Sequence, residues 1–141
     1  MSAEQKEARQ DPFKNLLAHL LKWLSLKPKN AHELAYLHRE FERLTAEPAF
    51  SLTRGEICDR FRIACILEPF ETAASFLPPA NHHLHKKCLN AALRLTALFG
   101  QISKVEALLQ AGADVNGQSK VGVTALQCAA TKGDTDIITF L

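Results

Sequence analysis

The sequence predicts an all-α protein in which a helical N-terminal region is stacked on a short array of helical repeats. Three observations lead to this prediction. Apolar residues recur with the period of a helix from Pro12 onward, and the last part of the chain repeats itself at a spacing of 33 residues. The alternation of polar and apolar residues that is typical of a strand is not found over any length.

Composition and charge are those of an ordinary globular protein. The chain has 141 residues, which suffice for one compact domain or for two small ones that share a core. Its net charge of +2 comes from basic residues interspersed with acidic ones, so neither a nucleic-acid nor a membrane partner is predicted. No apolar stretch approaches the roughly 20 residues of a membrane helix. Residues 1–11 are polar and are expected to form a disordered tail.

The first helix is expected to begin at Pro12, because proline suits the first turn of a helix and Asp11 can cap it. Pro28 ends this helix, since proline cannot continue it. One face of the segment is apolar at helical spacing and consists of Phe13, Leu16, Leu17, Leu20, Leu21 and Leu24.

Two further helices begin with the spacing of a capping box, in which a capping side chain is followed three residues later by a glutamate. These pairs are Asn30 with Glu33 and Thr53 with Glu56. A short fourth helix is expected between Pro69 and Pro78. Residues 12–80 are therefore predicted to form a helical region of four helices.

The repeat occupies the remainder of the chain. Four residues recur 33 positions later: Leu93 as Leu126, Ala97 as Ala130, Gly100 as Gly133, and Leu108 as Leu141. The sequence Gly-Ala-Asp-Val-Asn runs from Gly112 to Asn116 between the two copies. Because Gly112 and Gly133 each follow a predicted helix, we expect both in a left-handed backbone conformation. Thr124 is placed to cap the helix that begins after it.

At these positions the sequence resembles the ankyrin repeat family over residues 88–141. The resemblance implies an α-solenoid array of antiparallel helix pairs. The array is expected to cover residues 81–141. Its first repeat covers 81–116, and its second covers 117–141 and is incomplete at its C-terminus. Gln127 stands where the family has a histidine that makes hydrogen bonds to adjacent turns. The sequence does not decide whether the same bonds are made here. In the first repeat, a helix is expected from near Asn81 to Leu98.

A fainter copy of the repeat lies upstream. At a spacing of 32, Phe61 aligns with Leu93, so residues 54–79 are a candidate degenerate repeat. Because two repeats cannot bury their faces alone, the N-terminal helices are expected to cap the stack. The second repeat stops inside its outer helix at Leu141. We therefore expect either that the natural chain is longer or that another subunit covers this end. That subunit could be a second copy of the same chain.

The resemblance implies protein–protein recognition through the hairpin tips and the exposed face of the inner helices. The partner-binding candidates carried over by position are Asn90, Leu98, Phe99, Lys120, Val121, Val123, Thr131 and Lys132. Leu98 and Phe99 are large and apolar, so they either anchor a partner or pack under the N-terminal helices. The sequence does not specify which protein binds.

His85 and Cys88 share one face of the predicted helix, close to His82 and His83, as metal ligands would. No second cluster completes a site, so no metal is predicted. No cysteine or serine lies in a catalytic motif, which predicts a non-enzymatic chain with no catalytic residue and no cofactor. The four cysteines form no Cys-x-x-Cys pair and are expected to be buried, reduced thiols of a cytoplasmic protein.

An alternative function belongs to a different class. The N-terminal region could be an effector or catalytic module of a multidomain protein, with the ankyrin repeats as its targeting arm. Bacterial proteins that are secreted into the cytosol of a host cell are often built in this way, which gives a second candidate localisation. This alternative rests on analogy between folds alone.

Overall fold

The computed structural model describes residues 12–25, 30–46 and 52–141. In these ranges the chain forms eight α-helices and one 3-10 helix, with no strand, which confirms the all-α prediction. Helices long and apolar enough to cross a membrane are absent from this described part. The predicted disordered tail at 1–11, its capping residue Asp11 and the predicted stop at Pro28 lie outside the described residues.

The N-terminal region begins with α2 (Pro12–Ser25) and α3 (Ala31–Thr45), which pack against each other. The predicted apolar face of α2 is buried except for Leu21, which is partly exposed. At α3 the Asn30 side chain accepts a hydrogen bond from the His32 N–H at 2.9 Å. Glu33 instead contacts His19 of α2 at 2.5 Å, so the predicted capping box is not formed here and its glutamate joins the two helices.

The helix that follows, α4 (Arg54–Leu67), has the capping box that the sequence predicts. The Thr53 hydroxyl accepts from the Glu56 N–H at 3.2 Å, and the Glu56 carboxylate accepts from the Thr53 N–H at 3.4 Å. The predicted short fourth helix is divided into α5 (Phe70–Ala73) and the 3-10 helix η1 (Ala74–Phe76).

The next helix, α6 (His85–Leu98), starts four residues later than the expected start near Asn81. Two histidine side chains explain the difference. The His82 ring accepts a hydrogen bond from the Leu84 N–H at 3.0 Å, and the His85 ring lies 2.7 Å from the Pro78 carbonyl oxygen. These contacts hold the residues before His85 in turns, because local side-chain bonds compete with the helical ladder.

The remaining helices are α7 (Ile102–Gln110), α8 (Ala125–Lys132) and α9 (Thr135–Phe140). Gly112 and Gly133 have φ values of 106° and 70°, which confirms the predicted left-handed conformation. Thr124 caps α8 as expected. Gln127, which replaces the family's histidine, completes a capping box with Thr124, with bonds of 2.8 and 3.3 Å.

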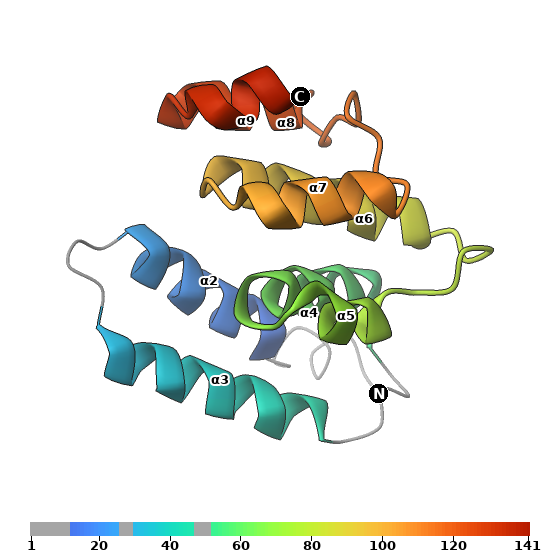
Figure 1. The fold of residues 1–141 in the computed structure, drawn as a ribbon. Helices are drawn as coiled ribbons and strands as arrows, with labels where there is room; N and C mark the ends of the chain where they lie inside the picture. Colours follow the sequence, from blue (N-terminus) through green and yellow to red (C-terminus); the bar gives the residue numbers. More distant parts are fainter. Residues whose placement is uncertain (1–11, 26–29, 47–51) are drawn as a thin grey trace.

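Figure 1 shows the helix pairs α8–α9, α6–α7 and α4–α5 as successive layers, with α2 and α3 towards the far end of the stack. Helices α4, α6 and α8 lie in a row, since α4 packs on α6 and α6 packs on α8. α2 also packs on α4. One hydrophobic core extends from Phe13 to Ile137. The N-terminal region is therefore stacked on the repeat array and shares its core, as predicted.

Candidate binding groove

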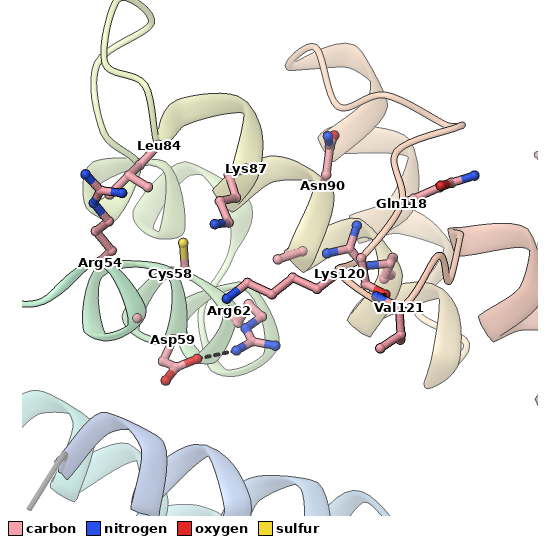
Figure 2. A pocket seen from close by; sticks show the side chains of 14 residues that line it. Arg54, Cys58, Asp59, Arg62, Leu84, Lys87, Asn90, Gln118, Lys120 and Val121 are labelled. Atoms are coloured by element: carbon pink, nitrogen blue, oxygen red, sulfur yellow. Dashed lines mark hydrogen bonds and ion pairs between the residues drawn. The ribbon is translucent and has the colours of Figure 1, made fainter.

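A groove runs along the inner helix α6 and consists of two adjoining hollows. The first, which we call the basic hollow, has a volume of about 690 Å3 and lies between α4, α6 and the loop before α8 (Figure 2). Six of the side chains in its wall are charged: Arg54, Asp59, Arg62, Lys87, Arg94 and Lys120. Among its other wall residues are Cys58, Asn90 and Val121.

The second hollow, which we call the apolar hollow, has a volume of about 230 Å3. Its own wall is formed by Leu95, Leu98, Val123 and Cys128. It shares Arg62, Ala91, Arg94 and Ser119 with the basic hollow. The two hollows are therefore continuous, and a ligand that fills one meets the border of the other.

The helical period explains why α6 supplies one side of both hollows. Lys87, Ala91, Arg94 and Leu98 follow one another at spacings of four, three and four, which places them on one face of a helix. On α4, Arg54, Cys58 and Arg62 are spaced four apart and line the opposite side of the basic hollow. The groove thus lies between α4 and α6, and the loop before α8 closes it.

The loop from Ser119 to Val123 is held by its own hydrogen bonds. The Ser119 N–H donates to the Val123 carbonyl at 2.9 Å, and the Ser119 hydroxyl accepts from the N–H groups of Val121 and Val123. Gly122, with φ of 84°, allows the chain to reverse direction. Val121 stands at the tip of this loop with 85% of its surface exposed.

Asn90 and Arg94 fix the preceding turn against α6. The Asn90 side-chain oxygen accepts from the Asp114 N–H at 2.7 Å. Arg94 reaches the Gly117 carbonyl at 3.5 Å. A Cβ atom at Gly117 would come within 2.7 Å of the Asn90 side-chain nitrogen, so only glycine fits there without a shift. Asn90 therefore lines the basic hollow and also positions the loop that closes it.

The basic hollow concentrates positive charge. Its wall has five basic side chains and one carboxylate, whereas the whole chain has 17 basic and 15 acidic residues. The carboxylate, Asp59, forms an ion pair with Arg62. Within the described ranges no acidic partner is recorded for Arg54, Lys87 or Lys120. In Figure 2 the Lys87 side chain points towards Cys58, and the Lys120 side chain reaches towards Arg62.

Cys58 lines the basic hollow and contacts Cys88 of α6, with 3.2 Å between the two sulfur atoms. The hydrogen bond from Cys88 lowers the pKa of Cys58 to about 7, with Arg62 and Lys87 adding to this effect and burial opposing it. The same contact and burial raise the pKa of Cys88. By contrast, burial raises the pKa of Cys65 to about 12. All four cysteines are free thiols, and Cys128 is only partly buried.

His85 and Cys88, which share one face of α6, do not converge on a common point. His85 faces the Pro78 carbonyl, and Cys88 faces Cys58. Among the described residues, no group of three histidine, cysteine or acidic side chains is arranged to hold a metal ion.

The structure brings together five of the eight partner-binding candidates. Asn90, Lys120 and Val121 line the basic hollow, and Leu98 and Val123 line the apolar hollow. The other three lie beyond both hollows. The Lys132 ammonium is 5.7 Å from the centre of the Phe99 ring, and the Thr131 hydroxyl donates to the Gln127 carbonyl at 2.8 Å.

Several groove residues were not among the candidates, and they include Arg54, Cys58, Arg62, Lys87 and Arg94. A signal for some of them is present in the sequence. Arg62 and Arg94 are 32 residues apart, the same spacing that aligns Phe61 with Leu93. If residues 54–79 are the predicted degenerate repeat, the two arginines occupy equivalent positions on adjacent helices, and such positions face the same side of a stack.

Residues 84–141 match the family model described as ankyrin repeats in many copies. The match includes the predicted range 88–141 and extends it to the residue before α6. It does not include residues 54–79, so the degenerate repeat at α4 and α5 stays a prediction. No solved structure matches the chain.

Proposed function

Because residues 84–141 are ankyrin repeats, which are generally protein–protein interaction modules, we propose that this chain binds a partner protein in the groove along α6. The continuity of the two hollows is the observation that carries this proposal. Together they offer one concave surface with a charged part and an apolar part, as specific interfaces do.

Each predicted contact residue has a place in this proposal. Val121 and Lys120 stand at the rim, where an approaching partner meets them first. Leu98 and Val123 offer apolar surface inside the groove. Asn90 acts by positioning the loop. Thr131 and Lys132 are exposed on α8, and Lys132 lies over Phe99, so these three would extend the contact surface past the groove.

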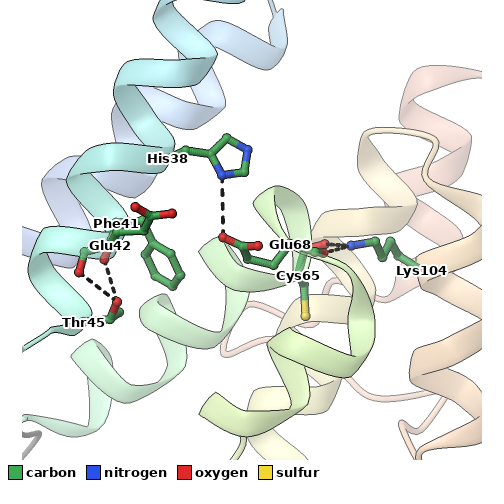
Figure 3. A network of polar contacts seen from close by, with 7 residues as sticks. All are labelled: His38, Phe41, Glu42, Thr45, Cys65, Glu68 and Lys104. Atoms are coloured by element: carbon green, nitrogen blue, oxygen red, sulfur yellow. Dashed lines mark hydrogen bonds and ion pairs between the residues drawn. The ribbon is translucent and has the colours of Figure 1, made fainter.

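The N-terminal region is part of the proposed binding module, because α4 forms one wall of the groove. The placement of α4 is supported by contacts with the array. The Lys104 ammonium of α7 donates to the Cys65 carbonyl at 2.7 Å and also to the Glu68 carbonyl (Figure 3). These carbonyls end α4 and would otherwise lack a partner. The Glu68 side chain in turn lies 3.6 Å from His38 of α3.

We also propose that the role of the chain is non-catalytic. The Cys58 thiol, whose pKa is lowered to about 7, is paired with another thiol and not with a histidine base. A nucleophilic cysteine is usually activated by such a base.

The groove is tested by capturing partners from cell lysate with the full chain and with a Val121→Asp, Val123→Asp double variant. We expect a set of captured proteins to be lost with the double variant, because two carboxylates are placed at the rim and in the apolar hollow. Quantitative mass spectrometry measures the loss. The Val121→Asp single variant repeats the test with a substitution that should not disturb the fold, because the Val121 side chain is exposed.

Ile102→Asp is the matched control, since Ile102 is also an exposed aliphatic residue but lies on the outer helix α7. We expect this variant to capture the same proteins as the unmodified chain. Equal capture by all variants, or equal loss with Ile102→Asp, would exclude the groove as the binding site.

A further inference from the structure

We propose that the groove selects an acidic segment of its partner in which a bulky apolar side chain stands next to the carboxylates. This inference rests on the proposed function and adds the chemistry of the bound segment. It is carried by the charge of the basic hollow and by the position of the apolar hollow beside it.

The charge of the basic hollow comes from three separate elements that converge. Arg54 and Arg62 come from α4, Lys87 and Arg94 from α6, and Lys120 from the loop. Only Asp59 opposes them, and it is engaged by Arg62. Cationic side chains held around one concavity raise the local concentration of anionic ligands and speed their association. A segment with several carboxylates is the complementary ligand.

The apolar hollow sets a second requirement. Its volume of about 230 Å3 is below the roughly 300–1,000 Å3 of pockets that hold small molecules, so it suits a single side chain. Leu95, Leu98 and Val123 line it, and a leucine or phenylalanine of the partner would remove this surface from water. Because Arg62 and Arg94 border both hollows, the apolar side chain must be close in sequence to the carboxylates.

A polypeptide segment fits the groove better than a nucleic acid. Single-stranded nucleic acids are bound by cations together with aromatic side chains on which the bases stack. The described residues that line the two hollows include no aromatic side chain. The apolar hollow, moreover, matches a side chain and has no counterpart in a phosphate backbone.

Selection of random peptides displayed on phage, with the full chain as the target, tests this inference. We expect the enriched peptides to carry aspartates or glutamates beside a leucine or phenylalanine. Synthetic copies of these peptides should bind about tenfold more weakly to a Lys87→Glu, Lys120→Glu variant, measured by fluorescence anisotropy. Added salt should weaken their binding to the unmodified chain, since it screens exposed charges.

The matched control is a Lys22→Glu, Lys86→Glu variant, which changes the net charge equally. Lys86 is adjacent to Lys87 on α6 and Lys22 is exposed on α2, and neither lines the groove. Peptide affinity should be unchanged in this variant. Circular dichroism verifies that both double variants retain their helices.

The outcomes separate this inference from the proposed function. Enriched peptides without acidic residues that still lose binding with Val121→Asp, Val123→Asp would overturn the inference and leave the proposed function standing. Peptides that bind equally to every variant, or a selection without enrichment, would count against both. Tighter binding of a single-stranded oligonucleotide than of any peptide, lost with Lys87→Glu, Lys120→Glu, would also overturn the inference.

Discussion

The two copies of the 33-residue repeat share several residues at equivalent positions but place them in very different environments. Leu93 and Leu126 correspond to each other, yet 1% of Leu93 is exposed and 46% of Leu126 is. Ala97 is buried, whereas its counterpart Ala130 is exposed. The cause is the stack itself, because α6 packs between α4 and α8 whereas α8 packs on α6 at one side. In a repeat array, neighbours decide how much a given residue contributes to stability.

Replacing the two leucines by alanine should expose this difference most strongly. Leu93→Ala removes a fully buried side chain and leaves a cavity, so it should lower the free energy of unfolding by about 2–5 kcal/mol. Leu126→Ala removes a half-exposed side chain and should cost less than about 1 kcal/mol. Urea denaturation followed by circular dichroism measures both values.

Similar losses of unfolding free energy in the two variants would mean that Leu93 and Leu126 are equally buried in solution. That outcome is expected if the face of α8 that carries Leu126 is covered by a second copy of the chain. Light scattering over a range of protein concentrations distinguishes this case, since the mass would rise with concentration.

The two glycines that follow α6 and α8 should show a smaller difference in stability when each is replaced by alanine. Both have left-handed backbone, with φ of 72° at Gly100 and 70° at Gly133. Gly133→Ala should cost about 1 kcal/mol, because alanine is strained in this conformation. Gly100→Ala should cost about 2 kcal/mol, since its Cβ would also meet the Asp134 carboxylate at 2.8 Å. That carboxylate caps α9 by accepting from the Ile137 N–H.

Gly55→Ala provides the control for this pair. Gly55 lies in the first turn of α4, and a Cβ there would meet only the Thr53 hydroxyl, at 3.9 Å. Alanine favours a helix more than glycine does, so this variant should be neutral or slightly more stable. Thermal unfolding would contradict the interpretation if Gly55→Ala lost as much stability as Gly100→Ala.

The features that the sequence predicted well are those that depend on neighbouring residues in the chain. The capping box at Thr53, the cap at Thr124 and the left-handed glycines are each decided within a few residues. The start of α6 was predicted too early, because a histidine can be solvated or can bond a nearby backbone group, and composition does not distinguish the two. Here the His82 and His85 side chains bond to backbone groups nearby.

The groove was predicted only in part, because its walls come from segments distant in the sequence. The basic residues were interpreted as interspersed with acidic ones, which is correct along the chain. In space, Arg54, Lys87 and Lys120 meet at one hollow although 66 residues separate the first from the last. The contact between Cys58 and Cys88 has the same origin, since it requires the register of α4 against α6.

The smallest expected difference in stability is between the capping boxes of α4 and α8. The first lies in the interior of the described stack and the second at its end. Both are formed by a threonine and the side chain three residues later, so in sequence they are nearly equivalent. Thr53→Ala leaves the Glu56 N–H without its acceptor in a helix turn where Glu56 is 2% exposed. This loss should cost about 1 kcal/mol, because water cannot replace the bond there.

At α8 the corresponding group belongs to Gln127, which is exposed, so water can take the place of the Thr124 hydroxyl. Thr124→Ala should therefore cost about 0.5 kcal/mol, at the low end for a lost cap. Hydrogen exchange can locate the effect in each variant. Faster exchange confined to α8 is expected for Thr124→Ala, whereas Thr53→Ala should accelerate exchange in both α4 and α6, because these helices share the core. If Thr124→Ala accelerated exchange in α4 as well, the end of the stack would be as cooperative as its interior.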